Sequence, residues 1–332
     1  MSKQATEDNQ IGRTRKTVAT YAEIAILVLL IVLFSILNPT TFPTFANINT
    51  ILNTAAVPTI IGVGATFVVL MGRIDLSVEG VMGAAGLVYV LLSPNSRTSG
   101  DWGFGAIVVA IALGAGLGLA TALVHTRLKV PTFIVSLGMW YVGLGIAAVL
   151  FGQEMQPFLS DPNAPLWPTS APLGVSNSYL VALGVVALGF LVERFTRLGR
   201  VPYAIGNNEA VALVTGIPVA RYCIYAFAIS GACSALAGVI ASMSLGAGAA
   251  NVGVGMVFFT LAAVVIGGTP LSGGKGGVLR TVIGVLVLST LYNGLILSGV
   301  APSLQSGVSG LVLVGAAIAA GWSQRNHLRV VK

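Results

Sequence analysis

The chain has 332 residues, of which 55% are hydrophobic and 8% are charged, and its mean hydropathy is +0.92. Soluble domains carry about 25% charged residues, so this composition excludes a water-soluble fold. The net charge of +7 belongs to short gaps between apolar runs, which argues against a nucleic-acid-binding protein. We therefore expect a membrane protein whose basic loops face lipid headgroups and cytoplasmic partners.

Apolar runs recur along the whole chain. A hydrocarbon core about 30 Å thick needs roughly 20 apolar residues per helix, and the backbone in lipid must satisfy its own hydrogen bonds. The sequence thus predicts an all-α polytopic membrane protein with about ten transmembrane helices. The eighth run is short and flanked by glycines, so a re-entrant segment is the alternative there. The predicted spans are 20–37, 48–71, 78–93, 104–124, 130–151, 178–193, 222–245, 256–268, 278–298 and 303–322.

The basic residues predict the orientation of these spans. Sixteen of the seventeen Lys and Arg residues fall on one side of the threading, and Arg97 is the exception. Cytoplasmic loops of membrane proteins collect Lys and Arg. We expect both tails, 1–19 and 323–332, to be cytoplasmic, with a transmembrane domain at 20–322 between them.

Ionisable and reactive residues are sparse inside the predicted spans. No Asp, Glu or His falls in the middle of a span, whereas ion-coupled transporters bury such groups to bind the driving ion. Cys223 and Cys233 lie ten residues apart in one predicted helix, about 15 Å along its axis, which excludes a disulfide. The chain lacks a phosphate-binding GxxxxGK[ST] loop, a nucleophile with a base, and a metal-ligand cluster. We expect no catalytic residue, metal or cofactor in this chain, so energy must enter from another subunit.

Glycine is unusually frequent, with 42 residues, many of them inside predicted helices. Small residues four apart let helix backbones approach closely. Close packing and a glycine-lined passage for a solute remain alternatives, and both can hold at different positions. The glycines with this spacing are Gly62, Gly64, Gly114, Gly116, Gly118, Gly143 and Gly145.

The longest cytoplasmic gap, about 194–221, contains signals for a short helix. Asn207 or Asn208 is suited to the N-cap, Glu209 to the first turn, and Gly216 to the end of the helix. The predicted helix has about two turns and is too short to span a bilayer. It would rest on the bilayer surface or dock into a partner's groove. The apolar residues that need such cover are Val211, Leu213, Val214 and Ile217.

Charged residues also cluster in the turn after the second span. Arg73, Asp75 and Glu79 lie two to six residues apart, near the predicted inner membrane face. An unpaired charge is costly near lipid, so we expect these three side chains to neutralise one another, with simple solvation as the alternative.

Four motifs, in order along the chain, resemble one family of membrane proteins. Residues 199–219 are similar to the EAA-like cytoplasmic loop in the membrane subunits of ribose/xylose/galactoside-type ABC importers. Residues 72–80 (GRIDLSVEG) resemble the family's GGIDLSVG, residues 130–138 (VPTFIVSLG) its VPxFIxTLG, and residues 262–276 (AAVVIGGTPLSGGKG) its AAVVLGGTSLSGGxG. The resemblance covers about 20–325. Arg73 and Glu79 replace glycines of the family pattern, and residues 255–259 (GMVFF) stand where an acidic stretch is usual.

This resemblance implies a permease subunit in the inner or plasma membrane of a prokaryote, which moves a monosaccharide or related polyol by alternating access. The implied partners are cytoplasmic ATPase subunits, an extracytoplasmic sugar-binding protein and a second permease copy, identical or related. A self-sufficient secondary transporter or channel is the alternative, and it requires a buried ion ligand.

The resemblance also implies two sets of site residues. The ATPase-coupling loop would comprise Asn207, Asn208, Glu209, Ala210, Leu213 and Gly216. The motif positions near the path or gate would be Asp75, Leu76, Ser77, Gly267, Gly268, Thr269, Ser272, Gly273 and Gly274.

Overall fold

The structure, a computed structural model, describes residues 22–301, 304, 307–308, 310–311 and 314–315. Within these residues the chain folds into helices joined by turns, and its β-pairing is limited to isolated bridges. The predicted tails 1–19 and 323–332 and most of the predicted span 303–322 lie outside the described residues. The predicted all-α class is confirmed for the described part of the chain.

Each of the first nine predicted spans corresponds to a helix. In the described part of the chain, six helices are long and apolar enough to cross a membrane, which agrees with a polytopic membrane protein. The helix α10 has 11 residues, about 16 Å at 1.5 Å per residue, so it cannot cross the hydrocarbon core alone. In chain order the helices are Ala22–Leu37, α2 (Phe45–Leu70), α3 (Val78–Leu92), α4 (Phe104–Leu128), α5 (Thr132–Phe151), α6 (Asn177–Phe195), α7 (Arg197–Asn207), α8 (Glu209–Val214), α9 (Val219–Leu245), α10 (Met256–Ile266) and α11 (Val278–Leu297).

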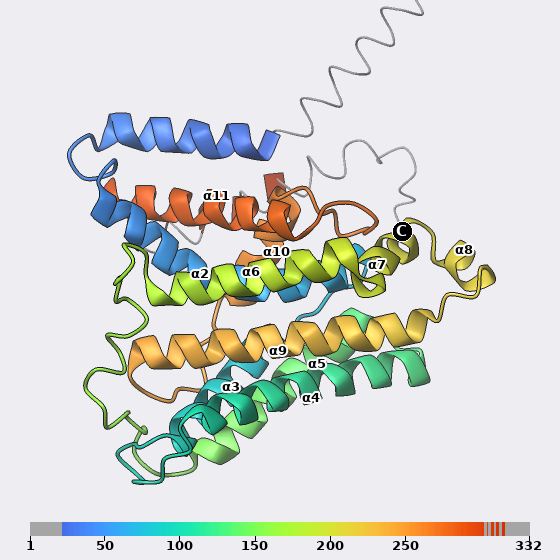
Figure 1. Cartoon of the computed structure of the whole chain (residues 1–332), viewed down its shortest axis with the longest axis horizontal. Helices are drawn as coiled ribbons and strands as arrows, with labels where there is room; N and C mark the ends of the chain where they lie inside the picture. Colours follow the sequence, from blue (N-terminus) through green and yellow to red (C-terminus); the bar gives the residue numbers. More distant parts are fainter. Residues whose placement is uncertain (1–21, 302–303, 305–306, 309, 312–313, 316–332) are drawn as a thin grey trace, which may run out of the picture.

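Two helices form the centre of the bundle. In the most apolar 18-residue stretch of each helix, 72% of the residues of α2 and 61% of those of α9 are buried, against 28% for α4 and 22% for α5. The helix α9 packs against α2, α3 and α4, and the long helices run side by side in Figure 1. The fully buried aromatic side chains Phe67 and Phe227 come from these two central helices. The outer helices therefore present apolar side chains to lipid, and the central pair forms the core.

Glycines allow the closest contacts between helices. A Cβ atom on Gly118 would lie 2.0 Å from the carbonyl oxygen of Phe227, and one on Gly114 would lie 2.4 Å from that of Gly231. The backbones of α4 and α9 therefore touch because neither position carries a side chain. In contrast, a Cβ atom on Gly116 or Gly145 would meet nothing within 4 Å. Close packing is thus confirmed for Gly114 and Gly118 but not for Gly116 and Gly145.

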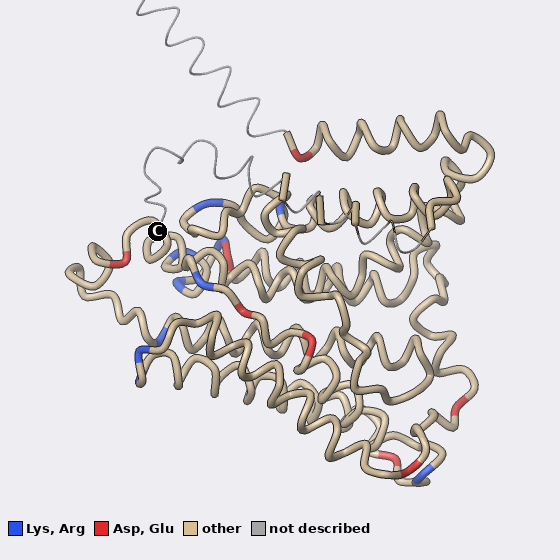
Figure 2. Tube along the Cα trace, turned by 180° about the vertical axis from the view of Figure 1, so that it is seen from behind, with Lys and Arg blue, Asp and Glu red and all other residues tan. Residues whose placement is uncertain are grey.

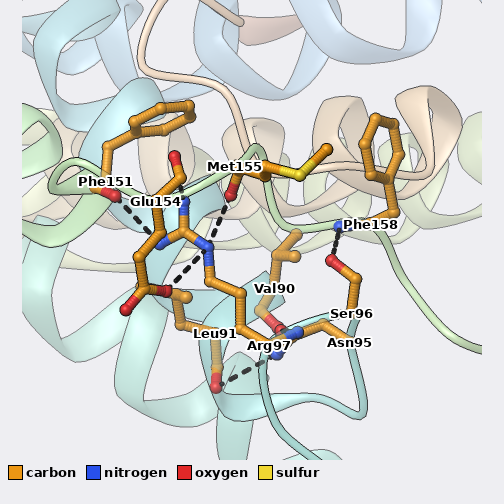
Figure 3. A network of polar contacts seen from close by, with 9 residues as sticks. All are labelled: Val90, Leu91, Asn95, Ser96, Arg97, Phe151, Glu154, Met155 and Phe158. Atoms are coloured by element: carbon orange, nitrogen blue, oxygen red, sulfur yellow. Dashed lines mark hydrogen bonds and ion pairs between the residues drawn. The ribbon is translucent and has the colours of Figure 1, made fainter.

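The two ends of the bundle differ in charge. Among the described residues, Lys and Arg gather mainly toward one end of the bundle in Figure 2. In the loop after α3, Arg97 donates hydrogen bonds to the carbonyl oxygens of Phe151, Glu154 and Met155, at 2.9, 3.2 and 2.7 Å (Figure 3). Its guanidinium also lies 5.2 Å from the centre of the Phe151 ring. One arginine thus joins the loop after α3 to the proline-rich loop after α5.

Candidate functional site

The short helix predicted in the cytoplasmic gap is present as α8. The side chain of Asn208 accepts a hydrogen bond from the Val211 N–H at 3.1 Å, so Asn208 and not Asn207 is the N-cap. Gly216 has φ +81°, and the N–H of Ile217 bonds to the carbonyl of Ala212 at 3.0 Å, which ends the helix. Because the cap, the first-turn Glu209 and the terminating glycine all lie as predicted, this local structure follows from the sequence.

One face of α8 is apolar and uncovered. Ala212 is buried at 3% exposure and holds α8 against the bundle, whereas Val214 is 89% exposed. The neighbouring Val211 and Leu213 are also exposed, and Figure 1 shows α8 projecting at one end of the molecule. Ala210 is exposed beside them. The predicted exposure is confirmed for Val211, Leu213 and Val214, whereas Ile217 is half-buried against the core. The three exposed side chains leave an apolar surface for a partner.

Another short helix, α7, directly precedes α8, and the sequence analysis did not predict it. The Thr196 side chain caps it by accepting a hydrogen bond from the Gly199 N–H, and Val201 and Ile205 lie on its packed face. Gly199 and Pro202 obscured this apolar periodicity in the sequence. A Thr followed by apolar residues at helical spacing was the available signal.

The end of α7 brings two motif segments together. Asn207, at its last residue, donates to the carbonyl of Gly274 at 3.3 Å, and the Gly274 N–H bonds to the Leu70 carbonyl at 2.9 Å. Gly72 and Gly273 both have positive φ and approach closely there. The cytoplasmic gap, the turn after α2 and the segment 267–277 therefore meet at one point. Leu70, Asn207 and Gly274 lie between 67 and 204 residues apart in the sequence, so only the tertiary structure reveals the junction.

The segment after α10 is closely packed. A Cβ atom on Gly267 would lie 2.2 Å from the Arg280 carbonyl oxygen, and Gly268 takes a positive φ of +79°. Thr269 is fully buried and accepts a hydrogen bond from the Gly277 N–H at 3.2 Å. The carbonyl oxygen of Ser272 would lie 3.0 Å from a Cβ atom on Gly72, so these two backbones are in close contact. These predicted motif positions hold the turn between α10 and α11 against the turn after α2.

Tyr203 and Glu193 fasten α7 to this turn. The Tyr203 hydroxyl donates to the Glu193 carboxylate, whose other oxygen accepts from the Val278 N–H at 2.8 Å. Burial, and then the hydrogen bond to Glu193, raise the pKa of Tyr203 above its usual range. Tyr203 consequently stays a neutral donor, and Glu193 joins α6, α7 and the start of α11.

Asp75 lies deeper in the bundle than the sequence predicted. Its carboxylate accepts hydrogen bonds from the N–H and hydroxyl of Ser77 at 2.9 and 2.6 Å, and from the Ser230 hydroxyl at 2.7 Å. Ser230 is the twelfth of 27 residues in α9, near its middle. Asp75 and Ser77 are 3% and 1% exposed, and Leu76 packs on the largest core cluster. The IDLS motif thus anchors a non-helical turn to the central helix.

The expected neutralisation among Arg73, Asp75 and Glu79 was wrong. Arg73 pairs instead with Glu209 of α8 at 2.9 Å, and its Nε donates to Nε2 of His125 at 3.2 Å. Because Nε2 of His125 accepts, its proton lies on Nδ1, which is 2.6 Å from the Val130 carbonyl oxygen. The sequence analysis missed the ion pair between Arg73 and Glu209 because the two residues are 136 positions apart.

Glu79 has a different partner again. Its carboxylate accepts hydrogen bonds from the N–H groups of Gly255 and Val257, at 2.9 and 3.3 Å, at the start of α10. A carboxylate at a helix N-terminus satisfies donors that have no partner within the helix. This buried side chain therefore holds α10 against α3, a role that its position near a predicted turn did not indicate.

An apolar helical bundle, with a short capped helix projecting near three joined loops, agrees with a polytopic membrane protein. The chain belongs to the family described as "Branched-chain amino acid transport system / permease component", which matches residues 47–317. The predicted resemblance to ABC importer permeases is thereby confirmed. The protein is a multi-pass permease of the inner membrane and a transport subunit.

Named relatives match nearly the whole chain. The ribose import permease protein RbsC of Haemophilus influenzae is 34% identical over 96% of this chain and 97% of its own length. RbsC of Escherichia coli K12 is 35% identical, covering 87% and 89%. The D-allose transport system permease protein AlsC of the same strain is 32% identical, covering 89% and 90%. No solved structure matches.

Proposed function

We propose that this chain is the permease subunit of an ATP-driven ABC importer and that it forms the translocation path for a monosaccharide or related polyol. The observation that carries the proposal is α8, a capped helix with an exposed apolar face, tied by Glu209 to the loop that contains Asp75. The relatives named for ribose and D-allose support the sugar as cargo.

The mechanism is alternating access without covalent chemistry. ATP-driven closure of two cytoplasmic ATPase subunits pushes α8 of each permease copy. The movement passes through Arg73 to the turn at residues 72–77 and through Asn207 to the segment 267–277, which are joined to the central helices. A second permease copy completes the path, and an extracytoplasmic binding protein delivers the sugar. The chain needs no cofactor for this role.

The proposed topology has about ten spans with both tails in the cytoplasm. The basic end of the bundle carries α8 and the Arg-rich α7, which suits the cytoplasmic face. The end with Arg97 and the proline-rich loop then faces outward, where the binding protein docks.

A test is to express the chain with the ATPase and binding protein encoded with it and to measure association and sugar uptake. Val214→Asp places a charge on the exposed face of α8, and we expect it to abolish ATPase association and uptake. Leu173→Asp, at a similarly exposed residue in the proposed outer loop, is the matched control and should leave association intact.

The alternative, a self-sufficient secondary transporter or channel, gives a different result. It predicts uptake that persists without ATP or the ATPase subunit. The carboxylates of Asp75 and Glu79 already accept internal hydrogen bonds, which favours a structural role over binding of a driving ion.

A further inference from the structure

A cavity of about 830 Å³ opens between α2, α10 and α11. Its walls come from the first half of α2, the start of α10 and the second half of α11. In the proposed topology these parts lie in the outer half of the membrane. The volume is ample for a small solute, because ligand pockets in proteins commonly measure about 300–1,000 Å³.

Polar side chains from two helices line this cavity. Thr50 and Thr54 lie one turn apart on α2, and Ser289 and Asn293 lie one turn apart on α11. These are polar positions in helices that are otherwise apolar enough to span a membrane. Polar groups inside membrane helices tend to mark a solute path, because they are costly in lipid.

Two threonines of α2 offer hydrogen-bond acceptors to the cavity. The hydroxyl of Thr50 donates to the Ala46 carbonyl and that of Thr54 to the carbonyls of Thr50 and Ile51, so both oxygens keep lone pairs to accept with. Pro58 lines the same wall and has no N–H, which leaves the carbonyl of Thr54 without its helical donor.

Asn293 adds a further acceptor. Its side-chain oxygen is shielded from solvent and has no hydrogen-bond partner among the described residues. A buried amide oxygen without a donor is costly, typically by about 1–3 kcal/mol, unless a ligand supplies one. A solute with several O–H donors fits such a set of acceptors.

Aromatic rings supply the apolar part of the cavity. Phe259 and Tyr292 lie with ring centres 5.5 Å apart at an angle of 37°, and Phe258 lines the wall beside them. The C–H faces of a sugar ring are apolar and pack on such rings, while its hydroxyls reach the surrounding acceptors.

No charged side chain lines the cavity among the described residues. An amino acid carries an ammonium and a carboxylate, and a sugar phosphate carries an anion, and each charge needs a partner when it leaves water. The cavity offers neither partner, so its chemistry favours a neutral solute.

We propose that this cavity is a subsite that holds the translocated solute through its hydroxyl groups, and that it selects neutral polyhydroxylated molecules over amino acids and phosphorylated sugars. The inference rests on the proposed function and adds the residues and the chemical selectivity. Glu79 is a positioning residue, because it holds the N-H of Gly255, which lines the cavity.

The first experiment measures uptake by the complete transporter in vesicles with labelled D-ribose and D-allose. Thr54→Val and Asn293→Leu each remove an acceptor at little change in volume. We expect each to lower uptake about tenfold at subsaturating sugar, the value of one hydrogen bond. ATP hydrolysis stimulated by the binding protein should stay within about twofold.

The matched control is Thr121→Val, since Thr121 also donates to a carbonyl four residues earlier but lies on α4, away from the cavity. It should transport normally. Wild-type uptake by Thr54→Val and Asn293→Leu would overturn the subsite, as would a parallel fall in their ATP hydrolysis, which indicates a disturbed fold. A wild-type complex that takes up neither sugar with ATP would instead refute the proposed function.

The second experiment needs the chain alone. Thr54→Cys, in a background with Cys223 and Cys233 replaced by alanine, is alkylated by a maleimide in membranes. We expect 100 mM D-ribose to slow the reaction at least threefold, and leucine or ribose 5-phosphate to have no effect. If leucine or ribose 5-phosphate slowed the alkylation as much as ribose does, the proposed selectivity would be overturned. If neither ribose nor allose slowed it, the subsite itself would be overturned.

Discussion

The guanidinium of Arg73 and the carboxylate of Glu209 form an ion pair of 2.9 Å between the turn after α2 and the first residue of α8. Arg73 is almost fully buried, whereas the Glu209 side chain is 48% exposed. A displacement of α8 therefore acts on a residue two positions before Asp75, which is bonded to the middle of α9. The pair is a direct link between the surface proposed for the ATPase and the central helix.

A double-mutant cycle tests this pairing. Arg73→Met and Glu209→Gln should be non-additive in their effects on unfolding in detergent, because each single change leaves the other charge without its partner. Half-exposed ion pairs are weak, so we expect a coupling of about 0.5–1 kcal/mol. Arg73→Met and Glu79→Gln provide the control cycle and should add, since these residues share no partner. Coupling confined to the control cycle would contradict the structure.

Gly216 should be required for α8 to end correctly. Its φ of +81° is strained for a residue with a Cβ, by about 1–2 kcal/mol, and more for a β-branched residue. Gly216→Val should therefore reduce ATPase association in a pull-down while membrane insertion is retained. Gly216→Asn is the control, because Asn tolerates this conformation. If both variants associate like the wild type, the end of α8 does not matter for docking.

Cysteine labelling should establish the orientation. Met155, in the loop held by Arg97, is 85% exposed, and Arg200 is exposed on α7. A membrane-impermeant reagent added to intact cells should label Met155→Cys and spare Arg200→Cys. Permeabilised cells provide the control, in which both should react. The reverse pattern in intact cells would invert the proposed topology.

Gly118 and Gly116 should respond oppositely to alanine. The Cβ of Gly118→Ala would lie 2.0 Å from the Phe227 carbonyl oxygen, so α4 and α9 must separate and stability should fall by at least about 2 kcal/mol. Gly116→Ala meets nothing within 4 Å and should raise stability by roughly 0.5–1 kcal/mol through helix propensity. Thermal unfolding in detergent measures both, and equal shifts would contradict the packing of α4 on α9.

Local features were predictable because they depend on neighbouring residues. The helix segments follow from runs of apolar residues, and α8 follows from Asn208, Glu209 and Gly216 in the order that caps and ends a helix. The obscured helix α7 shows the limit of this reasoning. Gly199 and Pro202 interrupt its apolar pattern and have low helix propensity. Packing of Val201 and Ile205 on the core compensates for that low propensity.

By itself the sequence determined the membrane class, the helix segments, the charge difference between the ends and the short capped helix, since each arises from composition or from contacts within a few residues. Only the tertiary structure decided which partners the charged residues take. Arg73 binds Glu209 and Glu79 binds the backbone at the start of α10, because helix packing brings together residues that are 136 and 176 positions apart. The cavity between α2, α10 and α11 likewise exists only when their polar positions face one another, which no local pattern specifies.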